Sequence, residues 1–215
     1  DKIEGGKIVV RSAVEGEKFV TLDGVERTLT SADLMICSAE RPMCIAGVYG
    51  GKESGISDET VNVFIESAYF HPVWVRKTAK RFGLNTDASF RFERGIDPNI
   101  QVYALKRAAM LMKELAGGRI TSEIIDINPR PTQHFEFEFS LDRARKLIGK
   151  DIPEATILGI LEALEVEVRG REGEVLKVAV PPYRVDVQRE ADLIEDVLRV
   201  YGYNNIEISD HVNST

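Results

Sequence analysis

The residues best suited to chemistry lie between Leu84 and Gly95. Small, hydroxylated and charged residues are crowded there, without the helix or strand period that a purely structural segment shows. Earlier in the chain come the glycine pair Gly50 and Gly51, and then Glu66 among apolar neighbours. A carboxylate in apolar surroundings requires a partner or a ligand. The sequence therefore predicts that these segments meet at one polar site.

The elements beside these segments are predicted to hold them in place. One helix should start at His71-Pro72 and end near Gly83. A second should start at Asp97-Pro98 and end at Gly117-Gly118, with a buried apolar stripe formed by Ile100, Ala104, Ala108, Leu111 and Leu115.

The first part of the chain is predicted to be an α/β (α+β) domain with a mixed sheet. Alternating β-prone runs and turn residues indicate strands at Ile8–Val10, Lys18–Leu22, Leu34–Cys37 and Met43–Val48, and a last strand at Ile124–Ile127. We expect this domain to span residues 1–130.

A proline-containing polar segment, Asn128 to Gln133, is predicted to be the domain boundary. The second domain should span residues 134–206, with a tail at 207–215. Its expected order is strand, helix, helix, strand, strand, helix, with Ser140 as a helix cap and Gly149 as a stop. Two short helices followed by a hairpin are typical of a small winged-helix-like α+β domain, which by itself assigns no function.

Composition narrows the possible functions. The 215-residue chain is 43% hydrophobic and carries 28 Lys and Arg against 35 Asp and Glu, for a net charge of −7. An acidic chain is a poor general binder of nucleic acid, although the run from Arg76 to Arg81 offers a local basic face. Cys37 and Cys44 are expected to be buried, reduced thiols. With no membrane-spanning or signal-like segment in the sequence, we expect a cytoplasmic protein.

The motifs together resemble the bacterial-type phenylalanyl-tRNA synthetase beta subunit. The resemblance is carried by GVYGGKESG, NVFIESAYF, LNTDASFRFERGIDP, PPYRVD and ADLIEDVLRVYGYNNI, in that order from about Asp1 to Ile206. It implies the C-terminal part of a tRNA-editing domain, followed by the winged-helix-like domain. The complete enzyme would be an ATP-dependent ligase that charges tRNA(Phe), with alpha and beta subunits in an alpha2beta2 assembly, and ATP would not bind to this part.

The resemblance also assigns an editing pocket to Gly50, Gly51, Glu66, Thr86 and Ala88. A pocket built for phenylalanine rejects tyrosine poorly, so the enzyme needs a second site that hydrolyses tyrosyl-tRNA(Phe). Glu66 would accept the phenolic hydroxyl, the glycines would form a wall, and Thr86 and Ala88 a small floor. No catalytic residue is assigned, because no Ser-His-Asp or Cys-His arrangement can be assembled. For each residue a structural role is the alternative: a glutamate on the polar side of a strand or paired with an arginine, or glycines in a turn.

The resemblance further implies a Mg²⁺ site shared with the alpha subunit at Asp186, Asp192, Glu195 and Asp196. The last three share a helix face, and oxygen ligands suit Mg²⁺. The alternative is a set of acidic residues that favour a helix N-terminus.

Two further expectations come from the resemblance. A family histidine of the editing pocket lies in a motif before Asp1, so we expect this chain alone to edit poorly. The rival function is a non-catalytic scaffold module that contacts nucleic acid or a partner subunit.

Overall fold

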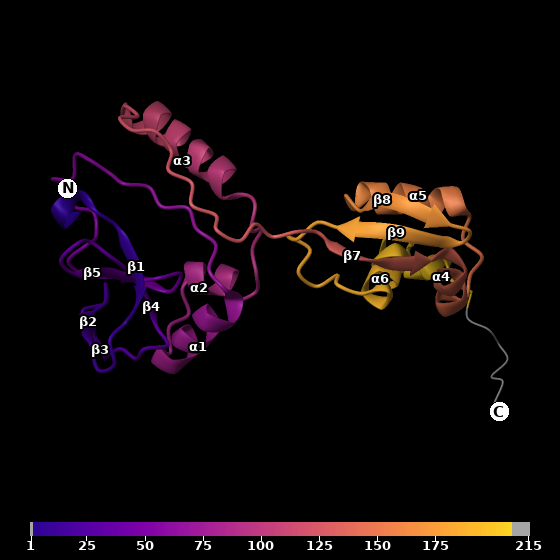
Figure 1. The fold of residues 1–215 in the computed structure, drawn as a ribbon, viewed down its shortest axis with the longest axis horizontal. Helices are drawn as coiled ribbons and strands as arrows, with labels where there is room; N and C mark the ends of the chain where they lie inside the picture. Colours follow the sequence, from indigo (N-terminus) through magenta and orange to yellow (C-terminus); the bar gives the residue numbers. More distant parts are fainter. Residues whose placement is uncertain (1, 208–215) are drawn as a thin grey trace. The chain divides into compact units, whose positions relative to one another are not determined.

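The computed structural model describes residues 2–207, which form two compact units that divide between Ile127 and Asn128. Unit 1 is the part before this division and unit 2 the part after it (Figure 1). Of the expected tail, residues 208–215 lie outside the described residues. No helix in the described range is long and apolar enough to cross a membrane.

Unit 1 is built from short antiparallel strands followed by three helices. Four strands form a sheet in the order β1-β4-β5-β6, and β2 pairs with β3 in a hairpin. The strands are β1 Val9–Ser12, β2 Lys18–Val20, β3 Glu26–Thr28, β4 Leu34–Cys37, β5 Pro42–Ile45 and β6 Tyr49–Gly50, and the helices are α1 Pro72–Phe82, α2 Asp87–Phe92 and α3 Gln101–Ala116, with a short 3-10 turn at Glu4–Gly6. The α+β class is confirmed, but the pairings between the described strands are antiparallel, where a mixed sheet was expected.

Helix α1 begins and ends where its sequence predicts. His71 caps its first turn, because its Nδ1 accepts a hydrogen bond from the Val73 amide at 3.3 Å. Gly83 ends it at φ +64°, a left-handed conformation that suits glycine. Its inner face, Val75 and Ala79, packs into the core of unit 1, which also contains Phe19, Leu29, Met35, Ile45 and Val48.

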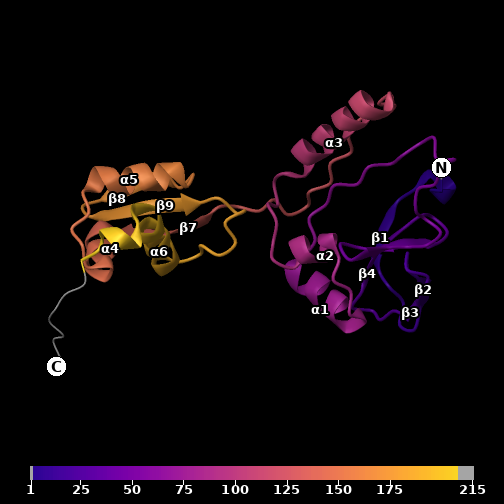
Figure 2. The ribbon, with the colours of Figure 1, turned by 180° about the vertical axis from the view of Figure 1, so that it is seen from behind.

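Helix α3 differs from the expectation in two ways. It begins at Gln101 rather than at Pro98, because the Asp97 side chain accepts from the Asn99 amide in a local turn. None of its residues is buried, so the predicted apolar stripe does not reach the core. Figures 1 and 2 both show α3 apart from α1, α2 and the strands. The predicted strand at Ile124–Ile127 is absent, and these residues have no regular structure.

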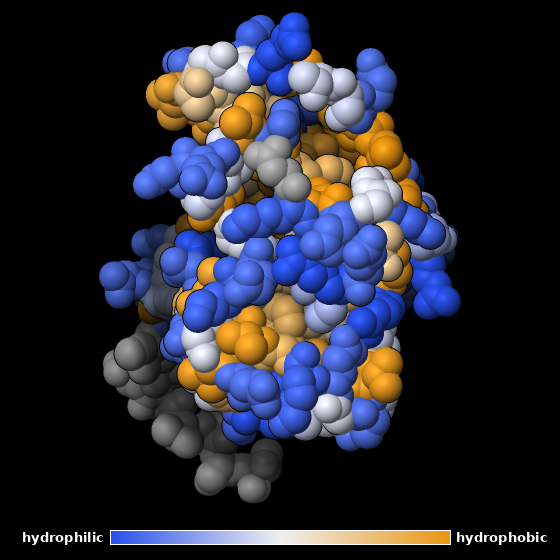
Figure 3. All heavy atoms as spheres, turned by 90° about the vertical axis from the view of Figure 1, so that its left-hand side faces the viewer, coloured by the Kyte–Doolittle hydropathy of each residue, from blue (hydrophilic) through white to orange (hydrophobic). Residues whose placement is uncertain are grey.

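Exposed apolar side chains are numerous in unit 1. Figure 3, seen from the side of this unit, shows them in patches between hydrophilic residues. Those more than 70% exposed are Ile56, Val61, Tyr103, Leu115, Ile125 and Ile127. They lie on α3 and on two segments without helix or strand, residues 52–71 and 117–127. These three parts of unit 1 therefore contribute little to its core.

Unit 2 follows the predicted order of elements. These are β7 Phe135–Ser140, α4 Leu141–Ile148, α5 Glu154–Ala163, β8 Glu167–Glu172, β9 Val175–Val180 and α6 Glu190–Tyr201, with a 3-10 turn at Tyr203–Asn205. The antiparallel sheet has the order β7-β9-β8, and Figures 1 and 2 show the helices of this unit on one of its faces. Phe139, Leu141, Leu161 and Leu193 are completely buried in the core between them. Burial of each such side chain stabilises the fold by about 1.5–3 kcal/mol.

Candidate functional site

Thr86 connects the polar segment to the sheet of unit 1. Its hydroxyl donates a hydrogen bond to the Val48 carbonyl at 2.7 Å, and it also accepts from the Ser89 amide at 3.0 Å. The Ser89 hydroxyl in turn accepts from the Thr86 amide at 2.9 Å. This reciprocal pair is a capping box, which starts helix α2 where the sequence shows no periodicity. One short side chain therefore fixes both the start of α2 and its position beside residue 48.

Gly50 and Gly51 lie two and three residues after Val48, but their environments differ. A Cβ atom on Gly50 would lie 2.9 Å from Leu22 Cδ1, on a side chain that is 51% exposed. A Cβ atom on Gly51 would lie 2.6 Å from the Met43 carbonyl oxygen and 2.6 Å from the Phe19 ring. The Gly50 position thus faces a movable surface side chain, whereas the Gly51 position faces the core and backbone.

Cys44 and Glu66 adjoin the Gly50 side of the sheet. Cys44 lies directly opposite Gly50 in the β5–β6 pair, so the two residues share one face. Burial raises the pKa of the Cys44 thiol to about 12, and the negative charge of Glu66 shifts this pKa in the same direction. The thiol is therefore protonated at neutral pH and is not a nucleophile. The expected reduced thiols are confirmed, with Cys37 buried and Cys44 half-buried.

The Glu66 residue is exposed by surface area, yet its carboxyl group is surrounded by enough protein atoms for desolvation to raise its pKa. Water reaches this exposed side chain and limits the size of the shift. No arginine or lysine pairs with Glu66 among the described residues, so the alternative of an ion-paired glutamate is not supported. Glu66 is therefore an exposed carboxylate without a cationic partner among the described residues.

The structure links some of the predicted residues through intermediate residues and not by direct contact with one another. Glu66 acts on Cys44, which is opposite Gly50, and Gly50 lies two residues from the Val48 carbonyl that binds Thr86. Ala88 is exposed on helix α2, two residues after Thr86. That all five predicted residues line one pocket stays a prediction.

Sequence reasoning missed the part that Cys44 has in this arrangement. Cys44 pairs with Gly50 between strands β5 and β6, and this register can be recognised only once the pairing of the strands is known.

The Arg91, Glu93 and Arg94 group is structural, as expected. Arg94 pairs with Glu93 at 2.7 Å, while Arg91 pairs with Asp87 at 3.3 Å on the same helix. The Arg94 guanidinium also stacks 3.7 Å above the centre of the Phe90 ring. The charges of these three side chains are therefore used in contacts within and beside helix α2, and none of these contacts involves a predicted residue of the editing pocket.

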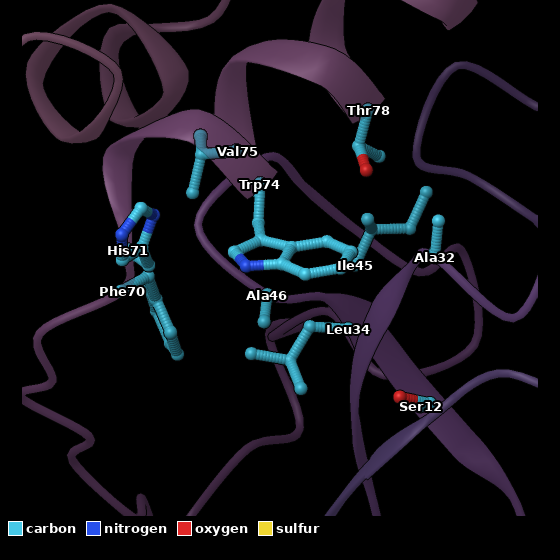
Figure 4. A pocket seen from close by; sticks show the side chains of 10 residues that line it. All are labelled: Ser12, Ala32, Leu34, Ile45, Ala46, Phe70, His71, Trp74, Val75 and Thr78. Carbon is cyan, nitrogen blue, oxygen red and sulfur yellow. The ribbon is translucent and has the colours of Figure 1, made fainter.

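A separate apolar cavity of about 260 Å³ lies beside the N-terminal end of α1 (Figure 4). None of the predicted site residues lines it. Its walls are formed by Ser12, Ala32, Leu34, Ile45, Ala46, Phe70, His71, Trp74, Val75 and Thr78. The Trp74 indole lies across the middle of this group in Figure 4 and is 52% exposed.

The four acidic residues expected to bind Mg²⁺ do not fit a metal site by themselves. Asp196 is buried and forms ion pairs with Arg184 and, at 3.3 Å, with Arg199. Asp192 accepts from the Arg189 amide at 3.0 Å and pairs with its guanidinium. Hydrogen bonding to Arg189 lowers the pKa of the Asp192 carboxyl.

Asp186 and Glu195, the other two residues of this set, are both exposed. Across residues 2–207, no three His, Cys, Asp or Glu side chains are grouped so that they could hold a metal ion. The residues of this chain therefore provide helix capping and a buried ion-pair network at this place.

Comparison with known proteins finds a matching family for each unit. Residues 1–117 match the family described as the B3/4 domain, and residues 137–203 match the tRNA synthetase B5 domain. The chain is 59% identical over 215 residues to the phenylalanine--tRNA ligase beta subunit of Bacteroides fragilis, covering 100% of the chain and 26% of that protein. The corresponding protein of Geobacter metallireducens is 47% identical over 209 residues, which cover 97% of the chain and 26% of that protein.

A solved N-terminal fragment of the phenylalanyl-tRNA synthetase beta subunit from Pyrococcus horikoshii is also similar. It matches with a TM-score of 0.47 at 21% identity, over 92% of this chain and 56% of that one. The chain spans about a quarter (26%) of the length of the curated relatives it matches. The resemblance inferred from the motifs is confirmed: the chain belongs to the B3/4 domain family, carries a tRNA synthetase B5 domain after it, and corresponds to part of a phenylalanine--tRNA ligase beta subunit.

Proposed function

We propose that unit 1 recognises tyrosine wrongly attached to tRNA(Phe) and takes part in its hydrolysis. The proposal is supported by links between three separate sequence motifs. Thr86 is bound to Val48 beside Gly50, and Gly50 lies opposite Cys44, on which the charge of Glu66 acts. Nothing in local structure requires these segments to meet.

The chemistry of recognition follows from the phenolic hydroxyl. Tyrosine donates this hydroxyl to the Glu66 carboxylate in a charge-assisted hydrogen bond. Phenylalanine lacks the donor, and its ring leaves the carboxylate without a partner and with fewer water molecules, which disfavours its binding. A site that binds the hydroxyl therefore separates the two amino acids far better than an apolar pocket does.

Hydrolysis itself requires water at the ester carbon. The water oxygen forms a bond to this carbon, the bond to the ribose oxygen breaks, and that oxygen takes a proton. The products are free tyrosine and intact tRNA. The protonated Cys44 thiol is not the nucleophile, so positioned water is the remaining attacking group in this neighbourhood.

The complete protein is proposed to be an ATP-dependent ligase that charges tRNA(Phe) with phenylalanine in the cytoplasm. Its partners would be an alpha subunit, in an alpha2beta2 assembly, and the tRNA. If Mg²⁺ is shared between subunits, Glu195 and Asp186 are the acids that remain exposed for it. Asp192 and Asp196 would first have to leave their arginine partners.

The experiment is a clearance assay in the complete ligase. Glu66→Ala is expected to slow the hydrolysis of tyrosyl-tRNA(Phe) and to leave the activation of phenylalanine unchanged. The matched control is Glu59→Ala, another exposed glutamate of the same irregular segment. Equal loss of both activities in Glu66→Ala would indicate damage to the fold and contradict the proposal.

The alternative is a non-catalytic contact module, and one observation favours it. Helix α3 has no buried residue and exposes Tyr103, Met110 and Leu115. Exposed apolar side chains on a helix that packs against no core favour an interaction surface. Unchanged clearance of tyrosyl-tRNA in Glu66→Ala would favour this second function for unit 1.

A further inference from the structure

Helix α1 carries a group of positive charges that the editing site does not use. Arg76, Lys77 and Lys80 are exposed, and none of them forms an ion pair within the part of the chain that the structure describes. Arg81, at the end of the same run, differs because it is bound to the buried Asp33 and donates to the Thr30 hydroxyl at 2.7 Å. The three unpaired cations stand out on a chain with a net charge of −7.

Lys77 is the cation of this group that lies next to an exposed aromatic ring, and Arg76 and Lys80, one turn apart, continue the basic surface away from it. Lys77 follows Trp74 by three residues, so the two side chains are neighbours on the surface of α1. The indole is 52% exposed and lines the cavity of about 260 Å³ (Figure 4). Large aromatic side chains usually bury most of their area, and half-exposure beside a cavity leaves a ring face available for stacking.

The size and lining of the cavity limit what can enter it. Its volume is below the roughly 300–1,000 Å³ of sites for drug-sized ligands. Leu34, Ala46 and Val75 make it mainly apolar, while Ser12 and His71 add hydrogen-bonding groups. A single flat ring with polar edges matches these properties.

We propose that Trp74 and the three cations of α1 bind a single-stranded segment of RNA. One base stacks on the Trp74 indole at the cavity, and the adjoining phosphates lie along Arg76, Lys77 and Lys80. An aromatic platform beside a basic surface is the usual combination in proteins that bind single strands. An apolar peptide would use the cavity but not the cations, so the charges favour RNA. None of the predicted editing residues lines the cavity, and the proposal does not depend on the editing function.

The test uses the 215-residue chain and oligoadenylate of about six nucleotides, a length within the site size of common single-strand binders. Trp74 is the only tryptophan, so its emission reports on this place directly. Stacking is expected to quench this emission. Three phosphate contacts should also give a slope of roughly −2 for the logarithm of affinity against the logarithm of salt concentration.

The variants test whether RNA binding depends on the three cations of α1 or only on the total positive charge of the chain. Arg76→Ala, Lys77→Ala and Lys80→Ala combined should weaken binding at least about tenfold, measured by anisotropy of a labelled oligonucleotide at low salt. The matched control removes three exposed, unpaired cations from α3, Lys106, Arg107 and Lys113, and should change affinity less than about twofold. Trp74→Ala should weaken binding at least about fivefold, and Trp74→Phe should restore most of it.

Three results would overturn the proposal. They are an unquenched Trp74 emission at saturating oligonucleotide, an equal loss of affinity in the two triple variants, and quenching by an apolar peptide but not by RNA. Circular dichroism of each variant shows whether its fold is intact. If Trp74→Ala does not fold, Trp74→Leu replaces it, since Leu keeps the apolar volume but cannot stack.

Discussion

The Thr86 hydroxyl donates a 2.7 Å hydrogen bond to the Val48 carbonyl, across 38 residues of sequence. This bond joins the polar segment that starts α2 to the turn that leads into Gly50. It places two sequence motifs beside each other through one side chain. Five features can be tested: this hydrogen bond, the neighbouring pair Gly50 and Gly51, the carboxyl group of Glu66, the ion pairs of Asp196 and the recognition of tyrosine.

Two replacements of Thr86 distinguish the contribution of its hydroxyl to the stability of unit 1 from that of its side-chain shape. Thr86→Val keeps the side-chain shape but removes both the bond to Val48 and the cap of α2, so we expect unit 1 to lose about 1–2 kcal/mol of unfolding free energy. Thr86→Ser keeps the hydroxyl and should lose less than half of that amount. Urea unfolding followed by Trp74 emission measures this, because the only tryptophan lies in unit 1. Equal losses in the two variants would contradict the account.

The two neighbouring glycines should respond differently to alanine. Gly51→Ala places a methyl group 2.6 Å from the Met43 carbonyl oxygen and the Phe19 ring, and overpacking of this kind costs about 1–3 kcal/mol. Gly50→Ala meets only the movable Leu22 side chain and should cost less than about 0.5 kcal/mol. The same unfolding assay compares them. The account fails at this point if Gly50→Ala is the more damaging substitution.

The stability of unit 1 should depend on pH through Glu66. Desolvation raises its pKa above the ordinary value of 4.5. A carboxyl group with a raised pKa in the folded state gives its full stabilisation below the unfolded-state pKa, and loses it as the pH rises through the folded-state pKa. Glu66→Gln removes this loss. Its unfolding midpoint should therefore gain on that of the wild type as the pH rises from below 4.5, and a constant difference between the two midpoints would contradict this.

Asp196 should stabilise unit 2 without any metal ion. Its carboxylate is buried between Arg184 and Arg199, and removal of one member of a buried ion pair costs about 3 kcal/mol. Asp196→Asn should speed hydrogen exchange of the α6 backbone by a large factor, whether or not Mg²⁺ is present. Glu195→Gln, an exposed neighbour on the same helix, is the control. Protection of α6 that depends on added Mg²⁺ would instead favour a metal site within this chain.

Local signals predicted much of the fold. His71, Gly83, Ser140 and Gly149 stand at helix ends in the structure, because caps and left-handed glycines depend on neighbouring residues alone. The first strand of the second domain was likewise predicted, and in the structure β7 alternates Phe135, Phe137 and Phe139 with the exposed Glu136 and Glu138.

The errors arose where the structure depends on distant contacts. The stripe on α3 has helical periodicity, but periodicity does not show whether a partner surface exists to bury it. The strand expected at Ile124–Ile127 likewise lacks a partner strand. For the acidic set expected to bind Mg²⁺, spacing placed Asp192 and Asp196 on one helix but did not reveal the arginines that bind them, and a site shared with another subunit stays a prediction. For the editing site, the motifs named Glu66 and Thr86, whereas Cys44 required strand register.

The most direct test of the central claim is the ratio of two rates in the complete ligase, the hydrolysis of tyrosyl-tRNA(Phe) and that of phenylalanyl-tRNA(Phe). If Glu66 accepts the phenolic hydroxyl, Glu66→Ala removes a charge-assisted hydrogen bond made only by tyrosine. The ratio should then fall by roughly ten- to hundredfold, mainly through slower hydrolysis of the tyrosyl ester. A ratio that Glu66→Ala leaves unchanged would contradict the assignment of Glu66 as the residue that recognises tyrosine.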